Sequence, residues 1–236
     1  MQKPRMIIFD AGRTLLDYTD IYTLKGVQAL MSHITSNPLQ LTAEEIDRRT
    51  NEIFDVFETC RKQLFEVPEC TILSLVYDLL QLEFSISLKE VERIIWNSDS
   101  VKIPMPHAKE MLEELNRIGI QTAVISNLDF SGDLLRSTLN ALFPNNRFQF
   151  VIASSDYGIR KPHPSIFNVG IAKSGLKAEE IWYVGDKIPV DVKGSQNAGM
   201  IPVLYKCPQN HYASLPDDLL IVEDLLDLPV LIQSVL

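Results

Sequence analysis

Three short apolar segments of the sequence end directly at residues that could take part in phosphate or metal chemistry. These residues are Asp10, Ser126 followed by Asn127, and Asp186 preceded by Gly185. Two carboxylates at neighbouring strand ends can share one hard cation, because Mg²⁺ prefers oxygen ligands. An aspartate or a serine can equally end a strand or cap the following helix. Each position taken alone therefore leaves a structural and a functional interpretation open.

The segments before these residues have the pattern of buried strands. Each is a continuous apolar run rather than an alternating one, which indicates burial on both faces, as in a parallel sheet. Five runs share this pattern, at 6–9, 122–125, 150–153, 182–184 and 201–205. In an open parallel sheet, ligands bind beyond the carboxyl ends of the strands. We therefore expect the polar residues to meet at one edge of the sheet.

Helical patterns separate most of these strands. Residues 107–118 carry apolar side chains at helical spacing and stop before Gly119, a typical residue after a helix end. Three more helices are expected, around 135–142, 164–174 and 189–198, and the apolar tail at 219–231 is expected to pack on the core. This alternation predicts an α/β fold with a three-layer, Rossmann-like core around a parallel sheet.

Residues 17–100 differ, because helical patterns follow one another there without a convincing strand. The segment Thr42-Ala43-Glu44-Glu45 is a capping box in sequence and opens a helix with one apolar face. Further helices are expected at 21–34, 70–82 and 87–97. The sequence thus predicts two domains. The core domain comprises 1–16 and 101–236, and an all-α helical domain, 17–100, is inserted into it.

Composition excludes several classes of protein. The chain of 236 residues is 46% hydrophobic and has a formal net charge of −9, whereas nucleic-acid-binding proteins usually present a basic face. No segment approaches the roughly 20 apolar residues of a membrane span, and the first apolar run is too short for a signal peptide. Three cysteines without a CxxC pattern favour reduced thiols. We expect a cytoplasmic protein that binds neither nucleic acid nor membrane, and the oligomeric state stays open.

Four segments, in this order along the chain, resemble the motifs of the haloacid dehalogenase superfamily of hydrolases. Residues 9–15 resemble the first motif, hhhDxDx(T/V), and 124–127 resemble the second. Arg160-Lys161-Pro162 resembles the third motif, and Gly185-Asp186 with Asp191 resembles the fourth, GDxxxxD. Each match is weak by itself, but their combination and order form a strong signal. The helical insert after the first motif resembles the C1-type cap of this superfamily.

The resemblance implies a Mg²⁺-dependent phosphatase that acts on a small phosphorylated metabolite. Asp10 would be the nucleophile and form an aspartyl-phosphate, while Lys161 and Ser126 would assist catalysis at the phosphoryl group. The implied phosphate-binding residues are Gly12, Arg13, Ser126, Asn127 and Lys161. The implied metal ligands are Asp10, the carbonyl of Gly12, Asp186 and, directly or through water, Asp191.

One residue departs from the pattern of the family's phosphatases. They usually carry a second aspartate two residues after the nucleophile, as the acid–base group, and here that position is Gly12. Loss of such a group costs about 10²–10⁴ in rate, so we expect a preference for substrates with good leaving groups. Two alternatives remain open at this point. One is a phosphonatase or dehalogenase, the former requiring a cap lysine among Lys25, Lys62 and Lys89. The other is a non-hydrolytic, phosphate-binding or regulatory descendant.

Overall fold

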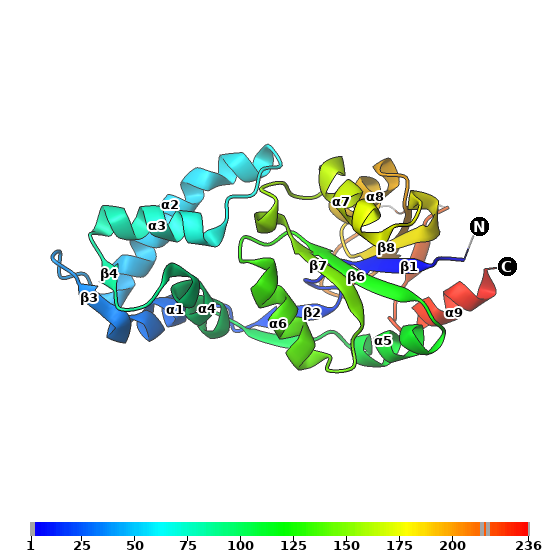
Figure 1. Ribbon diagram of the computed structural model, residues 1–236, viewed down its shortest axis with the longest axis horizontal. Helices are drawn as coiled ribbons and strands as arrows, with labels where there is room; N and C mark the ends of the chain where they lie inside the picture. Colours follow the sequence, from blue (N-terminus) through cyan, green and yellow to red (C-terminus); the bar gives the residue numbers. More distant parts are fainter. Residues whose placement is uncertain (1–2, 213–214, 216–217, 236) are drawn as a thin grey trace.

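The structure, a computed structural model, describes residues 3–212, 215 and 218–235 of the chain. It contains a part built on a large sheet and a part built of helices, and the described ends of the chain lie close together on the sheet part (Figure 1). None of the helices within the described ranges is long and apolar enough to cross a bilayer. The cytoplasmic location stays a prediction.

The large sheet contains all five predicted strands and one more. Its strands are β1 (Met6–Phe9), β6 (Gln121–Ser126), β7 (Phe148–Ala153), β8 (Ile181–Gly185), β9 (Ile201–Tyr205) and β10 (Leu220–Val222). They lie in the order β10-β9-β8-β1-β6-β7, and every neighbouring pair is parallel. Strand β1 is therefore flanked by β6 and β8, which brings the ends of these three strands to one edge.

Helices cover both faces of the sheet, which confirms the three-layer α/β core. Within β1, Ile7 and Phe9 face α5 (Ala108–Arg117), α6 (Gly132–Leu142) and α9 (Asp227–Ser234). Met6 and Ile8 face the other side, where α7 (Pro164–Ser174) packs. The predicted helix at 189–198 is a π-helical turn, Ile188–Val192, followed by α8 (Lys193–Asn197). The tail packs on the core as predicted, through Leu225, Leu228 and Ile232.

The inserted part is built of four helices around its own apolar core. The helices are α1 (Thr23–Leu30), α2 (Ala43–Lys62), α3 (Glu69–Leu80) and α4 (Leu88–Ser98). The predicted capping box is present, because Thr42 Oγ1 accepts a hydrogen bond from the N–H of Glu45 and the Glu45 carboxylate accepts one from the N–H of Thr42.

The expectation that the insert contains no strand is wrong in one detail. Strand β3 (Ile34–Ser36) pairs antiparallel with β4 (Glu83–Phe84) at the far end of the helices. Strands of three and two residues are too short to show an alternating pattern, and their pairing depends on segments distant in sequence. The insert is therefore helical, with one small strand pair.

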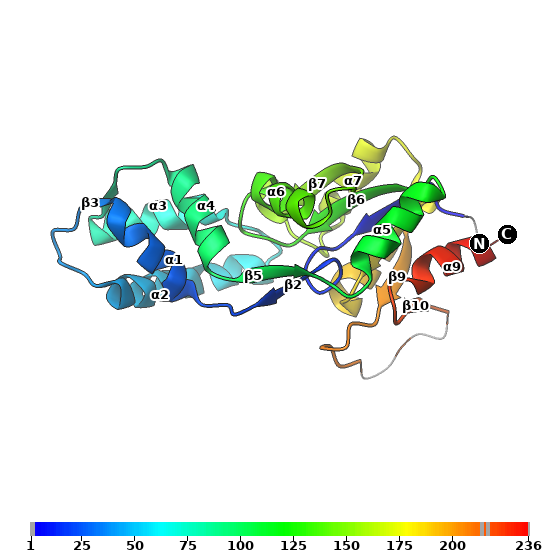
Figure 2. The same ribbon diagram turned by 90° about the horizontal axis from the view of Figure 1, so that it is seen from below.

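Two extended segments connect the parts. Strand β2 (Leu16–Thr19) pairs antiparallel with β5 (Val101–Pro104), and Figure 2 shows the two strands side by side between the helices and the sheet. The predicted domain limits of 1–16, 17–100 and 101–236 fall at these strands and stay a prediction. The insert also contacts the sheet part at a second place, where Phe65 forms an isolated bridge with Ile159.

Candidate active site

Asp10 lies at the carboxyl end of β1, in the centre of the sheet edge. Its N–H donates to the carbonyl of Val184, which continues the pairing of β1 with β8. Lys161 reaches it from the loop before α7, and Nζ of Lys161 donates to Oδ1 of Asp10 at 2.7 Å, to Oδ1 of Asp191 at 2.7 Å and to the hydroxyl of Tyr183 at 2.8 Å. The three predicted residues thus meet, with Tyr183 as a fourth member.

Lys161 is held as a cation by these contacts. The side chain is buried, and burial by itself would lower its pKa. The carboxylates of Asp10 and Asp191 outweigh this effect and hold the pKa of Lys161 well above its ordinary value. A buried ammonium group beside Asp10 can reduce the repulsion between this carboxylate and an approaching phosphate anion.

Asp191 positions Lys161 and the loop after β8. Its Oδ1 accepts from Lys161, and its Oδ2 accepts from the backbone N–H of Lys187 at 3.0 Å. The site requires a glycine at position 185, because a Cβ atom there would lie 2.5 Å from both Cβ and Cγ of Asp191. Burial raises the pKa of Asp191 to about 6. Since both its oxygens are hydrogen-bonded, direct metal ligation by Asp191 stays a prediction.

Asp186 supplies the clearest sign of a metal site. Its Oδ1 is buried and makes no hydrogen bond to a described residue, while its Oδ2 accepts from Nδ2 of Asn210 at 2.6 Å. Burial, followed by the charge of Asp10, raises the pKa of Asp186. Oxygens of Asp10, Asp186 and Asp191 lie within 4.8 Å of one another. An unpartnered buried oxygen in an all-oxygen donor set fits a hard divalent cation such as Mg²⁺. The carbonyl of Gly12 stays a predicted fourth ligand.

The second predicted motif divides between two tasks. Ser126, at the end of β6, is nearly buried and lines the same cavity as Asp10. Asn127 instead fixes the lysine loop: its Nδ2 donates to the carbonyl of Lys161 at 2.9 Å, and its Oδ1 accepts from the N–H of Lys161 at 2.7 Å. The side chain of Asn127 is thus a structural clamp, and its predicted part in phosphate binding rests on its backbone amide.

Gly12 and Arg13 follow Asp10 at the rim of the cavity. Arg13 has a positive φ of 58°, and its Nη1 donates to Oδ1 of Asn210 at 3.1 Å. Asn210 therefore links Arg13 to Asp186, whose carboxylate it also contacts. Among the described residues Arg13 makes no ion pair with an acid of the insert. Its guanidinium stays beside the cavity.

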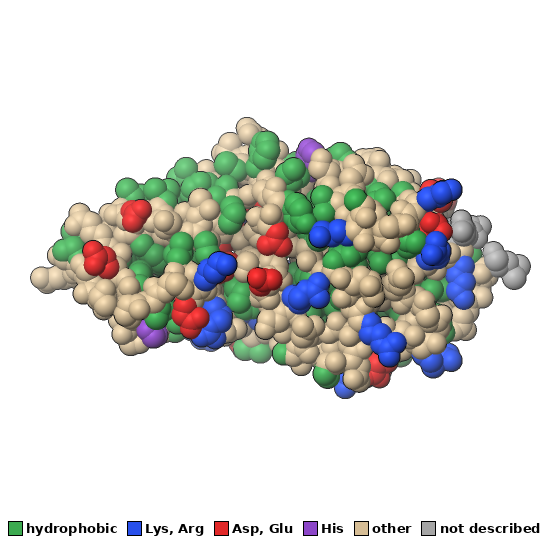
Figure 3. Space-filling model, viewed as in Figure 1, with side chains coloured by type: hydrophobic (Ala, Val, Ile, Leu, Met, Phe, Trp, Pro, Cys, Tyr) green, Lys and Arg blue, Asp and Glu red, His purple; other side chains and the backbone are tan. Residues whose placement is uncertain are grey.

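Most of these residues line one cavity of about 420 Å³ at the sheet edge, whereas Asp186 and Asn210 line a neighbouring cavity that shares Lys187 with it. Four basic side chains contribute to the wall of the first cavity: Arg13, Arg160, Lys161 and Lys187. The cavity can therefore attract a phosphate group although the chain as a whole has a net charge of −9. On the face shown in Figure 3, acidic and basic side chains lie beside one another in the middle, between the helical part and the sheet part.

Sequence patterns missed two residues of the site, Tyr183 and Asn210. Tyr183 lies inside an apolar strand, where a phenol usually indicates packing, and its hydroxyl also donates to the carbonyl of Ile125. Asn210 comes from the loop after β9, which carries no motif. Tyr18 was not missed, because its place at the start of the linker predicts that it lines the cleft, and it does border the cavity. Only the polar end of Tyr183 in a buried strand could have signalled its role.

The phosphonatase alternative finds no support in the geometry. Such an enzyme requires a lysine of the insert at the reaction centre. Lys25, Lys62 and Lys89 are all exposed, and none of them lines the cavity around Asp10. Dehalogenases of this superfamily generally lack a metal-binding carboxylate in the fourth motif, whereas this chain carries Asp186 there.

Comparison with known proteins identifies the family of this chain. Residues 7–204 match the family described as haloacid dehalogenase-like hydrolase. Relatives include glyceraldehyde 3-phosphate phosphatases of Methanocaldococcus jannaschii, 34% identical over 49% of this chain and 49% of the relative, and of Pyrococcus furiosus, 24% identical over 87% and 82%. A phosphoserine phosphatase of Thermus thermophilus is 34% identical over 40% of this chain and 37% of the relative. The chain thus spans about half the length of the first of these relatives.

Solved structures share the fold over nearly the whole chain. A 2-haloacid dehalogenase from Pseudomonas syringae pv. Tomato superposes with a TM-score of 0.65, at 19% identity over 98% of both chains. A phosphatase of the same superfamily from Thermococcus onnurineus gives a TM-score of 0.63, at 19% identity over 96% of this chain and 97% of that one. With the family match over residues 7–204, the parallel sheet and the Asp10–Lys161–Asp186 site, this chain belongs to the haloacid dehalogenase-like hydrolases.

Proposed function

We propose that the protein is a Mg²⁺-dependent phosphatase of small phosphorylated metabolites, with Asp10 as the nucleophile. The observation that carries this proposal is the contact of Asp10 with buried Lys161, in a cavity whose wall contains four basic side chains. A carboxylate beside a fixed cation suits attack on a phosphoryl group, because the cation compensates the charge of both anions. The relatives named glyceraldehyde 3-phosphate phosphatase and phosphoserine phosphatase agree with this substrate class.

The reaction would proceed in two displacements. Oδ2 of Asp10, which accepts no hydrogen bond from a described residue, attacks phosphorus, and the bond to the leaving-group oxygen breaks. Lys161 and Ser126 bind the equatorial phosphate oxygens. Water then attacks the aspartyl-phosphate, which releases phosphate and restores Asp10. Mg²⁺, held by Asp10, Asp186 and the carbonyl of Gly12, would neutralise charge on the phosphoryl group.

Proton transfer is the weak step of this mechanism. Gly12 has no side chain to protonate the leaving group. The ring of Tyr18 is the side chain nearest to the place where a Cβ atom at position 12 would lie. Burial, then the charges of Asp10 and Asp129, raise the pKa of Tyr18, so this phenol stays protonated but releases its proton reluctantly. Acyl and aryl phosphates, whose leaving groups need little protonation, are therefore the expected substrates.

A substrate screen tests this proposal. The protein with Mg²⁺ is assayed against acetyl phosphate, aryl phosphates, alkyl phosphates and phosphonoacetaldehyde, beside Asp10→Asn and the matched control Asp78→Asn. Asp78 is exposed on α3 and takes no part in the site. We expect phosphate release that Asp10→Asn abolishes and Asp78→Asn preserves. No hydrolysis of any phosphate ester or acyl phosphate would overturn the proposal, and so would hydrolysis that survives in Asp10→Asn.

A further inference from the structure

A second cavity, of about 350 Å³, lies beside the first, and its wall contains four acidic residues but only two basic ones. Residues of all four helices of the insert line it, together with β2, β5 and the loop after β6. Tyr18 and Leu128 line both cavities. A phosphate ester bound at Asp10 could therefore extend its leaving group past these two residues into the second cavity. We refer to this second space as the cap cavity.

Three carboxylates of the cap cavity lack a charged partner. Asp47, Glu69 and Asp99 all line it, and among the described residues none of them forms an ion pair. The two basic residues of the wall are engaged elsewhere. Arg61 pairs with Asp129 at 2.6 Å and also lies near Glu66, and Nζ of Lys102 donates to the carbonyls of Trp96 and Ser100.

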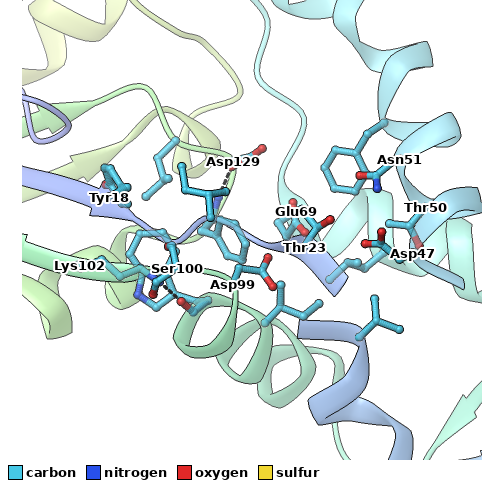
Figure 4. A pocket seen from close by; sticks show the side chains of 18 of the residues that line it. Tyr18, Thr23, Asp47, Thr50, Asn51, Glu69, Asp99, Ser100, Lys102 and Asp129 are labelled. Atoms are coloured by element: carbon cyan, nitrogen blue, oxygen red, sulfur yellow. Dashed lines mark hydrogen bonds between the residues drawn. The ribbon is translucent and has the colours of Figure 1, made fainter. Parts of the chain in front are cut away.

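Glu69 is the central member of this group. The residue is only 4% exposed, and its carboxylate receives no hydrogen bond from a described residue, although its backbone N–H donates to the carbonyl of Asp129. Figure 4 shows its side chain among the residues that line the space, beside Thr23 and between Asp129 and Asn51. Burial raises the pKa of Glu69 well above its ordinary value, and the charges of Asp129, Asp99 and Glu92 add to this effect. A buried carboxyl without a partner is costly.

Aromatic rings form much of the remaining wall. They belong to Tyr18, Phe54, Tyr77, Trp96 and Phe130, and the rings of Trp96 and Phe130 lie 5.0 Å apart. The faces of such rings attract organic cations, and so do the carboxylates between them. A neutral apolar ligand would leave Glu69 unpartnered, whereas an ammonium group would supply up to three N–H donors.

Resting on the proposed phosphatase function, we propose that the cap cavity binds an ammonium group carried by the leaving group of the substrate. The substrate is then a zwitterion: its phosphate lies among Arg13, Lys161 and the other basic residues of the first cavity, and its amine lies among Glu69, Asp99 and the aromatic rings. This arrangement disfavours the reverse orientation, because the phosphate would then lie among carboxyl groups and the ammonium among four basic side chains.

Three isosteric phenols test the proposal by binding, without any requirement for turnover. Tyramine carries an ammonium, tyrosol a hydroxyl and 4-propylphenol a methyl group at the same position. In calorimetric titrations of the Mg²⁺-loaded protein at neutral pH, we expect tyramine to bind at least about tenfold more tightly than either, which corresponds to about 1.4 kcal/mol. Equal or weaker binding of tyramine would overturn the proposal.

Variants assign the preference to the carboxyls. In Glu69→Gln and Asp99→Asn, the ratio of the tyramine and tyrosol dissociation constants should fall toward one. In Asp78→Asn, which removes an exposed carboxylate from the same helix as Glu69, the ratio should not change. The proposal would be overturned if both cavity variants kept the same preference for tyramine over tyrosol as the unmodified protein. It would also be overturned if the control variant lost that preference.

Hydrolysis of the matching aryl phosphates separates this inference from the proposed function. Tyramine phosphate should exceed tyrosol phosphate in kcat/KM by a similar factor, since their leaving groups differ little in pKa. If no phosphate is hydrolysed but tyramine still binds more tightly than tyrosol in calorimetry, the phosphatase function is contradicted and the ammonium site is retained. Hydrolysis of all phosphates at equal rates, with equal binding of the phenols, would contradict the ammonium site alone.

Discussion

A Cβ atom at Gly12 would lie 3.3 Å from Cε2 of Tyr18. A side chain at position 12, where the family's phosphatases carry their second aspartate, would therefore face an aromatic ring and not open solvent. The ring borders both the cavity at Asp10 and the cap cavity, so it lies where the leaving group must pass. Because the phenol of Tyr18 holds its proton firmly, it can donate a hydrogen bond but contributes little to proton transfer.

Replacement of Gly12 by aspartate should restore the absent acid–base group. The unmodified protein should show rates that depend steeply on the pKa of the leaving group, and Gly12→Asp should raise the rate for alkyl phosphates by about 10²-fold or more. The Tyr18 ring must shift slightly to admit the new side chain, since 3.3 Å is a tight contact. Gly12→Asn, of equal size but without an acid, is the control. Similar rates for aryl and alkyl phosphates in the unmodified protein would contradict this account.

Tyr183→Phe tests whether the hydroxyl of Tyr183 positions Lys161. The change removes the hydroxyl that accepts from Lys161 and donates to the carbonyl of Ile125, while the ring keeps its contact with Phe167. The free energy of unfolding should fall by about 1–3 kcal/mol, because a buried donor and a buried acceptor lose their partner. We expect kcat to fall about tenfold with KM less affected, as measured by steady-state kinetics and urea denaturation. Tyr157→Phe, at an exposed site, should change neither, and equal effects of both variants would refute the assignment.

Mg²⁺ should bind to the folded protein through Asp186. Removal of divalent ions by a chelator should abolish phosphate release, and Mg²⁺ at 100 times its dissociation constant should raise the free energy of unfolding by about 2.7 kcal/mol. Asp186→Asn should weaken Mg²⁺ binding at least about tenfold, because the buried Oδ1 loses its charge. Thermal melts with and without Mg²⁺ measure this, with Asp78→Asn, at an exposed site on α3, as the control. An unaltered Mg²⁺ shift in Asp186→Asn would exclude Asp186 as a ligand.

Asp99 should make the stability of the ligand-free protein depend on pH. Burial raises its pKa from 3.8 to about 7, so between these values the folded protein binds more protons than the unfolded chain. Stability from this group therefore falls as pH rises through that window, and Lys102, with a pKa of about 8, titrates above it. The free energy of unfolding of Asp99→Asn, minus that of the unmodified protein, should increase by about 1–2 kcal/mol from about pH 4.5 to about pH 7.5. This figure allows for solvent screening of the half-buried group.

Urea denaturation at both pH values measures the Asp99 effect. The difference in free energy of unfolding between Asp99→Asn and the unmodified protein should be larger at the higher pH. For Asp78→Asn, whose carboxylate is exposed, the difference should not depend on pH. A constant or falling difference for Asp99→Asn would mean that the carboxyl is not buried as the structure shows.

The sequence predicts the sheet well because its strands are locally distinctive. Each of the five apolar runs is a strand, and Asp10, Ser126 and Asp186 lie at strand ends because parallel strands share one edge. The two short strands of the insert and β10 are missed, since their pairing partners are remote in sequence and their side chains show no alternation. Strands β2 and β5, which pair with each other between the two parts, are missed as well.

The missed residues of the site have a common physical reason. Asn210 and Tyr183 act through contacts with Asp186 and Lys161 that only the folded chain creates. Gly12 illustrates the opposite case: the absence of a carboxylate is visible in the sequence, but the presence of the Tyr18 ring against it is not. The composition of the cap cavity likewise emerges only when four helices and the loop after β6 come together.

The central claim is that Asp10 receives the phosphoryl group, and trapping that group is the most direct test. The protein with Mg²⁺ is mixed with ³²P-labelled acetyl phosphate, quenched in acid during turnover, and digested for mass spectrometry. We expect label and a phosphate mass on the peptide that contains Asp10, discharged by hydroxylamine, and none in Asp10→Asn. Label on a residue other than Asp10 would contradict the account. So would turnover of the unmodified protein without any label, together with full activity of Asp10→Asn.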